Sequence, residues 1–162
     1  MRYNKIRKMD VSNGPGIRVS IFMQGCTFNC KNCFNPETHD FNGGKEFTDE
    51  TIERVLQLCD NNYIEGLSIL GGEPMHPNNI EGTTKLAKAF KERFPNKTVW
   101  SWTGFLYENL KDKDVVNYLD VLVDGIFKEE LHNPKLEWRG SSNQRVIDMK
   151  KTIQNGYVVS FI

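Results

Sequence analysis

Three cysteines close together in the sequence are the residues best suited to carry out chemistry. Cys26, Cys30 and Cys33 follow the spacing Cys-x3-Cys-x2-Cys, on a segment that comes directly after the apolar residues 17–23. Thiolates are soft ligands that select zinc, copper(I) or iron–sulfur clusters, and three of them on one short loop can converge on one centre. The spacing therefore predicts a metal site, and a structural zinc ion there would need a fourth protein ligand.

The remaining cysteine does not supply that fourth ligand in our interpretation. Cys59 comes 26 residues after Cys33, on the apolar face of a helix predicted over 48–60, where a free cysteine behaves as a small buried hydrophobic residue. Three protein ligands leave one coordination position open, which is typical of metal centres that carry out chemistry. The alternatives are a zinc ion completed by His39 or His76, or three cysteines that belong to the core.

A glycine-rich acidic turn follows another predicted strand, at residues 67–70. Its sequence is Gly71-Gly72-Glu73-Pro74. Glycine permits close approach to the backbone, and a carboxylate such as Glu73 accepts hydrogen bonds from an ammonium group. Because ligands bind at the carboxyl ends of strands in α/β folds, we expect this turn and the cysteines to share one edge of a sheet.

The elements that must position these residues alternate between strand and helix. Glycine-bearing loops separate them, and this order favours a parallel sheet with crossover helices. Outside these elements we expect an irregular start, a loop over 35–45 and, over 139–145, a solvated loop or a docking surface. The predicted strands cover residues 17–23, 67–70, 97–103 and 121–123, and the predicted helices cover 48–60, 81–94 and, more weakly, 106–117.

The length of the chain limits the architecture. A complete eight-unit βα barrel takes about 250 residues, and this chain has 162. We therefore predict one domain over 1–162 with an α/β fold, built as a partial, open βα barrel. Arg18 is expected to be an exposed strand residue rather than a neighbour of the metal site. The apolar tail over 157–162 is expected to add an edge strand, or to cover the barrel or a partner.

Composition excludes several classes of function. Lys and Arg number 21, Asp and Glu also number 21, and the net charge is zero, which argues against a large basic surface for nucleic acid. There is no apolar run near the roughly 18 residues of a membrane span. The first residues lack the apolar middle region of a secretory signal. We therefore expect a cytoplasmic protein that binds neither nucleic acid nor membranes.

The cysteine spacing and the Gly-Gly-Glu-Pro turn together resemble the radical S-adenosylmethionine enzymes. The resemblance implies that Cys26, Cys30 and Cys33 hold one 4Fe-4S cluster per chain, in a partial barrel of the radical S-adenosylmethionine type. It also implies that the amino and carboxylate groups of S-adenosylmethionine chelate the fourth iron. In that family the glycine-rich turn helps to hold the methionyl amine, a role that falls here on Gly71, Gly72 and Glu73.

The same resemblance implies further contacts with S-adenosylmethionine. Many members carry an aromatic residue just before the third cysteine, close to the adenine, but this sequence has Asn32 there and Phe34 after the cysteine. Asn32, Cys33 and Phe34 are therefore assigned to cofactor binding, with Asn32 contacting the adenine through its amide or simply turning the loop. Thr103, at the end of its strand, is assigned to the ribose or to the methionyl carboxylate.

Other segments narrow the resemblance to activases of glycyl radical enzymes. Residues 13–18, Asn-Gly-Pro-Gly-Ile-Arg, resemble the segment that precedes the first strand in these activases. Residues 102–105, 121–125 and 138–145 resemble the members that serve anaerobic (class III) ribonucleoside-triphosphate reductases. The implied reaction is reductive cleavage of S-adenosylmethionine to a 5'-deoxyadenosyl radical, which takes a hydrogen from a glycine Cα of the large reductase subunit.

The implied partners are that large subunit and an electron donor such as reduced flavodoxin. A homodimer and a heterotetramer with the reductase both agree with the resemblance. Two alternatives stay open at this point. One is an activase of another glycyl radical enzyme, and the other is a noncatalytic zinc or iron–sulfur module.

Overall fold

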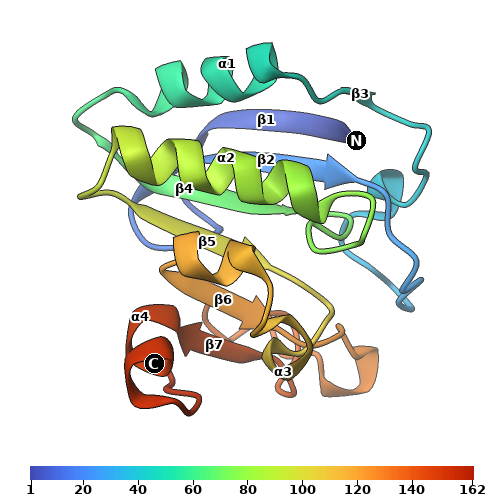
Figure 1. Ribbon diagram of the computed structural model, residues 1–162. Helices are drawn as coiled ribbons and strands as arrows, with labels where there is room; N and C mark the ends of the chain where they lie inside the picture. Colours follow the sequence, from blue (N-terminus) through green and yellow to red (C-terminus); the bar gives the residue numbers. More distant parts are fainter.

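A seven-stranded mixed sheet organises the protein, whose computed structural model describes residues 1–162 (Figure 1). The strands lie in the order β3-β1-β2-β4-β5-β6-β7. The central β2, β4, β5 and β6 are parallel, whereas β1, β3 and β7 pair antiparallel at the sides. The sheet is not closed, because β3 and β7 are separate edges. The strands are β1 Arg2–Asp10, β2 Ile17–Gln24, β3 Lys45–Glu46, β4 Ile64–Gly71, β5 Thr98–Trp102, β6 Val121–Asp124 and β7 Arg145–Asp148.

The helices are mostly short, and two of them carry most of the packing. α1 begins after Thr48, which caps it in a reciprocal capping box with Thr51. None of the helices combines the length and the apolar character that crossing a lipid bilayer would require. The α-helices are α1 Asp49–Cys59, α2 Ile80–Arg93, α3 Tyr107–Leu110 and α4 Met149–Asn155, and the 3-10 helices are η1 Pro36–Thr38, η2 Asp114–Tyr118 and η3 Glu129–Leu131.

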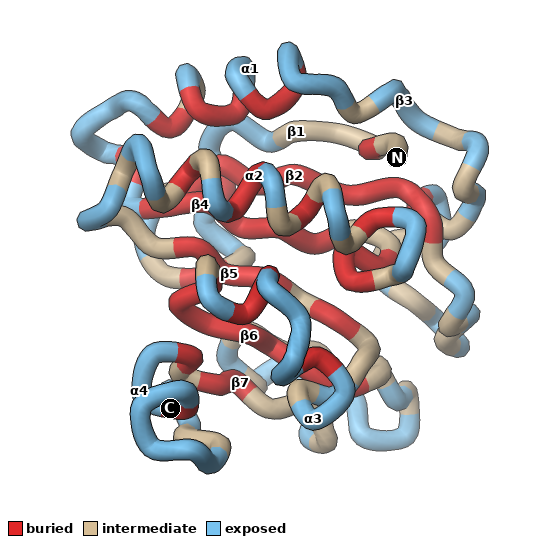
Figure 2. Tube along the Cα trace, in the orientation of Figure 1, coloured by how far each residue is buried: buried red, intermediate tan, exposed pale blue.

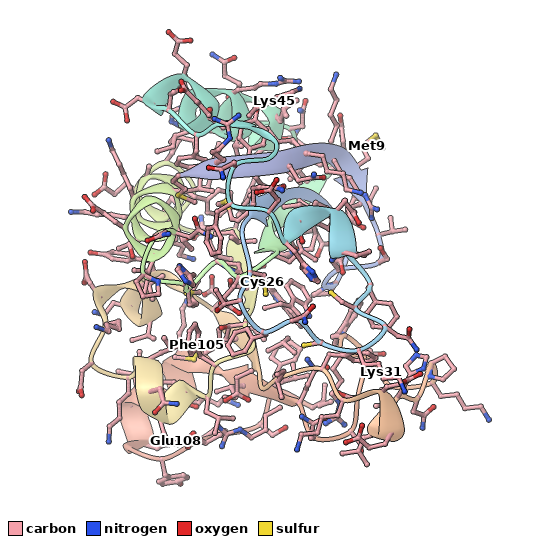
Figure 3. The ribbon with its side chains drawn as sticks, turned by 90° about the vertical axis from the view of Figure 1, so that its right-hand side faces the viewer. Met9, Cys26, Lys31, Lys45, Phe105 and Glu108 are labelled. Carbon is pink, nitrogen blue, oxygen red and sulfur yellow. The ribbon has the colours of Figure 1, made fainter.

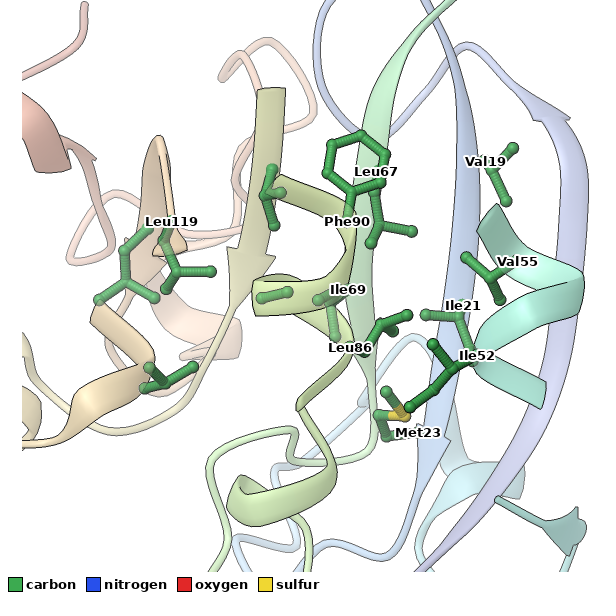
Figure 4. Packing of buried hydrophobic residues seen from close by; sticks show 14 of the residues in the cluster. Val19, Ile21, Met23, Ile52, Val55, Leu67, Ile69, Leu86, Phe90 and Leu119 are labelled. Atoms are coloured by element: carbon green, nitrogen blue, oxygen red, sulfur yellow. The ribbon is translucent and has the colours of Figure 1, made fainter. Parts of the chain in front are cut away.

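The main core lies between one face of the sheet and helices α1 and α2. Alternate strand residues such as Ile21 of β2 and Ile69 of β4 are fully buried there. Figure 4 shows Ile52 of α1 beside Ile21, and Leu86 and Phe90 of α2 beside β4. The inward faces of the helices are buried and the outward faces exposed (Figure 2). The predicted parallel strands and crossover helices α1 and α2 are thus confirmed, within a few residues at each end.

The ends of the chain differ from the prediction. The start is not irregular but forms β1, an outer strand whose basic side chains hide the usual alternation of apolar residues. Lys5 and Arg7 of β1 lie over the ring of Phe22, with 4.8 and 4.9 Å from the charged groups to its centroid. The predicted helix over 106–117 is broken into α3 and η2. Strand β7 and helix α4 were not predicted, and the loop predicted over 139–145 leads directly into β7.

The opposite face of the sheet carries an aromatic cluster that the C-terminal tail helps to cover. Trp100 is buried on this face, and the ring of Trp102 lies 5.8 Å from it. The ring of Phe161 packs edge-on against Trp100 at 5.2 Å. The tail forms one isolated bridge, between Ser160 and Ile147, and no strand. The tail therefore pairs with the edge strand β7 without forming a strand of its own, and its Phe161 covers the sheet face. Its role in covering a partner stays a prediction.

Arg18 is fully buried, so its expected exposure was wrong. Its guanidinium donates to the Ser68 hydroxyl at 2.8 Å and to the carbonyls of Leu67 and Thr98 at 3.0 and 2.9 Å. A Cβ at Gly66 would lie 2.1 Å from the Thr98 carbonyl oxygen and 2.5 Å from the guanidinium. Glycine at 66 thus leaves the room that this buried cation needs, at the amino ends of the strands and away from the cysteine loop.

Candidate functional site

A cavity of about 530 Å³ opens where the parallel strands end. This volume lies within the usual range for small-molecule sites. Figure 3 looks onto this edge of the sheet, with Cys26 near its centre and Phe105 below it. Among the residues predicted from the sequence, those lining the cavity are Cys26, Cys30, Cys33, Phe34, Gly71, Gly72, Glu73 and Thr103, whereas Asn32 does not line it.

Hydrogen bonds join the cysteine loop to the glycine-rich turn. The Glu73 amide donates to the carbonyl of Gly25, at the start of the cysteine loop, at 2.8 Å. The Asn35 side chain, just past Cys33, donates to the carbonyl of Gly71 at 3.2 Å. A Cβ on Gly72 would lie 2.7 to 3.0 Å from three backbone carbonyl oxygens, including that of Gly25. The two motifs therefore form one unit whose close packing requires glycine.

The three thiols of the loop are partly exposed, and two of them, Cys26 and Cys30, stay protonated more readily than usual. Burial raises the pKa of Cys26 and of Cys30, while the backbone N–H groups of Phe28 and Phe127 act in the opposite direction. A metal ligand has to be the thiolate, so loading of this site releases protons. Cys59, the last residue of α1, differs from the loop thiols because it is fully buried in the core. This burial raises its pKa to about 12. Its predicted core position is confirmed.

Glu73 is a buried carboxyl group, only 1% exposed, at the wall of the cavity. Its oxygens accept hydrogen bonds from the Thr103 hydroxyl at 2.6 Å and from the backbone amides of Gly104 and Met75 at 2.7 and 2.8 Å. Burial raises the pKa of Glu73 to about 7, against the opposing effect of these three donors. A cation in the cavity would favour the ionised form. The Thr103 hydroxyl, which also lines the cavity, thus donates its hydrogen to Glu73, and its assignment to the ribose or the methionyl carboxylate stays a prediction.

We expect the stability of the metal-free chain to depend on Glu73 and on pH. The pKa of its carboxyl is about 7 in the folded chain and 4.5 ordinarily, so between these values the folded state holds a proton that the unfolded state has released. The free energy of unfolding therefore falls by about 3 kcal/mol as the pH rises from 4.5 to 7. Glu73→Gln removes this slope, as anaerobic urea unfolding at several pH values will show.

Glu92→Gln is the matched control, because Glu92 is exposed on α2. It should keep the slope of the natural chain. If Glu73→Gln and the natural chain lose the same stability over this pH interval, then Glu73 is ionised throughout and the assignment is wrong.

The loop after β6 forms a wall of the cavity that the sequence did not reveal. The ring of Phe127 lies 4.9 Å from that of Phe34, and the ring of His132 lies 5.6 Å from it. Glu129 accepts a hydrogen bond from the Asn32 amide and lies 3.4 Å from the Lys31 ammonium. The Asn32 side chain is therefore engaged outside the cavity, on the loop over 126–142. Of the three residues assigned to cofactor binding at this point of the loop, only Cys33 and Phe34 line the cavity.

The segment over 138–145 is folded against the strand ends rather than solvated. Trp102 donates through its indole N–H to the Trp138 carbonyl at 2.7 Å. Arg145 pairs with Asp124 and with Glu108 and lies outside the cavity. Trp138, Arg139 and Gln144 do line it. In the sequence, the polar residues 139–145 are the only signal for this wall. No periodic pattern of apolar residues accompanies them.

The donor atoms fit an iron–sulfur cluster better than a zinc ion. Three thiols line the cavity, while His39 and His76 do not, and the His76 Nδ1 atom accepts a hydrogen bond from the Asn78 amide. Soft thiolates without oxygen ligands suit 4Fe-4S clusters, so these residues fit that group.

Comparison with known proteins agrees with this chemistry. The family described as "4Fe-4S single cluster domain" matches residues 12–147. A protein of Enterobacteria phage T4 is 40% identical over 146 residues, covering 90% of this chain and 93% of its own. Its counterpart in Vibrio cholerae is 40% identical over 148 residues (89% and 96%), and that in Escherichia coli K12 is 37% identical over 150 residues (90% and 97%). All three are named anaerobic ribonucleoside-triphosphate reductase-activating protein.

Proposed function

Because the chain belongs to the family of anaerobic ribonucleoside-triphosphate reductase-activating proteins and contains a 4Fe-4S domain, we propose that it generates the glycyl radical of such a reductase. Cys26, Cys30 and Cys33 hold the cluster, and S-adenosylmethionine is the second cofactor. The observation that carries the proposal is the hydrogen-bonded unit of the cysteine loop and the Gly71–Gly72 turn, which lines one cavity with three thiols and no fourth.

When bound, the cluster and S-adenosylmethionine would supply the difficult chemistry, which is one-electron cleavage of the sulfonium C–S bond to methionine and a 5'-deoxyadenosyl radical able to take a hydrogen atom from a glycine Cα. The chain itself positions the ligand and limits the access of water. In this proposal Glu73 accepts hydrogen bonds from the methionyl ammonium, and the support for it is a buried carboxylate at the cavity wall that the Thr103 hydroxyl and the Gly104 amide orient. No general base is required.

The open sheet suits a macromolecular substrate. Edge strands β3 and β7 do not meet, and we interpret the sheet as a partial barrel of the radical S-adenosylmethionine type. Phe34, which lines the cavity, is 62% exposed, so the cavity is reachable from outside the molecule. A glycine-bearing loop of the large reductase subunit can enter there, while an electron donor such as reduced flavodoxin delivers electrons to the cluster.

Anaerobic reconstitution with iron and sulfide tests the proposal. We expect about four irons per chain, an EPR signal of the reduced cluster that changes when S-adenosylmethionine is added, and 5'-deoxyadenosine as a product. Mixing with the reductase large subunit should give a glycyl radical by EPR, with reduced flavodoxin or dithionite as the donor. One zinc per chain and no 5'-deoxyadenosine would refute the enzyme and favour a noncatalytic module.

The partner enzyme is tested in the same experiment. Pyruvate formate-lyase, another glycyl radical enzyme, serves as the comparison substrate. A radical formed on it, and none on the ribonucleotide reductase, would show that the cofactor chemistry is assigned correctly and the partner wrongly.

A further inference from the structure

Arg139 is a cation in the wall of the cavity without a carboxylate partner in the chain. Its Nη1 atom donates to the Gln144 carbonyl at 2.6 Å, its Nε atom is buried without a hydrogen bond, and its Nη2 atom donates to no protein group. By contrast, Arg145 is neutralised by Asp124 and Glu108. An arginine held in a cavity with free donors has unused capacity to bind an anion.

The backbone around Arg139 is fixed in an unusual conformation. Trp138 has a φ of 66°, in the left-handed region that is unfavourable for a residue other than glycine. The side-chain oxygen of Gln144 accepts the Gly140 and Ser141 amides at 2.9 and 3.1 Å, and its amide group donates to the Gly125 carbonyl at 3.0 Å. These bonds attach the segment to the end of β6.

Close packing holds the same segment against the cysteine loop. A Cβ on Gly140 would lie 2.7 Å from the ring of Phe34 and 3.1 Å from that of Phe127. Phe34 follows Cys33 directly in the sequence. The position of Arg139 is therefore determined from both sides, by β6 and by the loop that carries the thiols.

The charges of the cavity wall are complementary to an α-amino acid. Glu73 is the only acidic residue that lines the cavity, and the two arginines that line it are Arg139 and Arg7. Arg7 lies 4.0 Å from the buried carboxylate of Asp10 and is partly neutralised. A zwitterionic amino acid presents one ammonium and one carboxylate, and Glu73 and Arg139 are the groups of opposite sign available to them.

We propose that Arg139 binds the α-carboxylate of the amino acid whose ammonium group Glu73 binds. This inference rests on the proposed function, in which that amino acid is the methionyl part of S-adenosylmethionine. A carboxylate has two oxygens, so one can accept hydrogen bonds from a guanidinium while the other is engaged elsewhere. Arg139 is then a binding residue for the cofactor, and the Gln144 bonds are what keep it in place.

The test is a thermodynamic cycle that combines two changes, the substitution Arg139→Gln and the removal of the carboxylate from the ligand. Arg139→Gln and the natural chain are reconstituted with iron and sulfide, and each is titrated anaerobically with S-adenosylmethionine and with its decarboxylated analogue. We expect Arg139→Gln to weaken binding of S-adenosylmethionine by about 10- to 100-fold and to leave binding of the analogue unchanged. Any contribution of the carboxylate to iron coordination is lost in both proteins and cancels in the cycle.

Two variants and one measurement support the interpretation of the cycle. Arg54→Gln removes an arginine on the exposed face of α1, outside the cavity, and should change neither affinity by more than about twofold. Arg139→Lys keeps the charge without the planar fork and should recover part of the affinity. Iron content and far-UV circular dichroism establish that each variant is folded and loaded.

Three outcomes would overturn the inference. An equal loss of affinity for both ligands would mean that Arg139 only shapes the wall, and unchanged affinities would mean that it binds no carboxylate. An unchanged affinity with a shifted reduction potential would make Arg139 a charge partner of the cluster itself. If the natural chain binds a cluster but neither ligand, it is the proposed function that fails, and that result is distinct from all three.

Discussion

Replacing Cys26, Cys30 or Cys33 by alanine, one at a time, is expected to abolish the cluster and all cleavage of S-adenosylmethionine. Each thiol lines the same cavity, and the described structure offers no neighbouring cysteine to substitute for a lost ligand. With two thiolates left, the cluster is held incompletely and is lost or degraded. Iron content, the visible absorbance of the cluster and 5'-deoxyadenosine formation measure the effect, which we expect to reach the level of the iron-free protein.

Cys59→Ala is the matched control for these three substitutions. Cys59 is 0% exposed in the core between α1 and the sheet, so its replacement leaves a small void and lowers the free energy of unfolding by about 1 kcal/mol. Cluster content and cleavage should stay at the level of the natural chain. A Cys59→Ala protein that is folded but contains no cluster would show that the three-ligand assignment is wrong.

Arg18→Met is expected to lower the free energy of unfolding by about 3 to 5 kcal/mol. The guanidinium of Arg18 satisfies buried acceptors on two strands, at Leu67 and Thr98, and the hydroxyl of Ser68. Methionine fills much of the volume but donates no hydrogen bond, so several buried polar groups lose their partner at about 1 to 3 kcal/mol each before relaxation. Anaerobic urea unfolding of the metal-free chain at neutral pH measures the difference.

Arg54→Met, on the exposed face of α1, removes the same charge and makes a matched control. Its free energy of unfolding should change by less than about 0.5 kcal/mol. Burial lowers the pKa of Arg18 to about 10, so the residue stays charged at neutral pH, and removing a buried charge without loss of stability would contradict our account. Arg18→Met should still bind the cluster at temperatures where it is folded.

The sequence predicts best those parts of the fold that are determined locally. β2, α1, β4, α2, β5 and β6 each carry their own apolar periodicity or capping residue, such as Thr48, and the structure confirms them. The outer strands β1 and β7 depend on pairing with distant segments, and their charged side chains do not alternate with apolar ones. The position of Arg18 could not be predicted either, because its partners come from β4 and β5, about 50 and 80 residues away.

The residues of the candidate site also differ in how far the sequence predicts them. Spacing alone predicts a site at Cys26, Cys30 and Cys33, and a short turn motif predicts a role for Glu73, because each motif is contiguous in the sequence; all four residues line one cavity. The sequence indicates Arg139 only as one residue of the polar segment 139–145. Its relation to the cysteines exists only once Gly140 packs against Phe34, and no sequence pattern encodes that contact.

The cavity is assembled from distant parts of the chain, which has a consequence for its biosynthesis. Its thiols are complete at Cys33, but Gln144, which fixes the opposite wall, is translated 111 residues later. At about 5 to 20 residues per second, the nascent chain carries three uncovered thiols for roughly 5 to 20 seconds. Iron delivered during that interval would meet an open loop, because the wall that faces the thiols forms only once Gln144 has been translated.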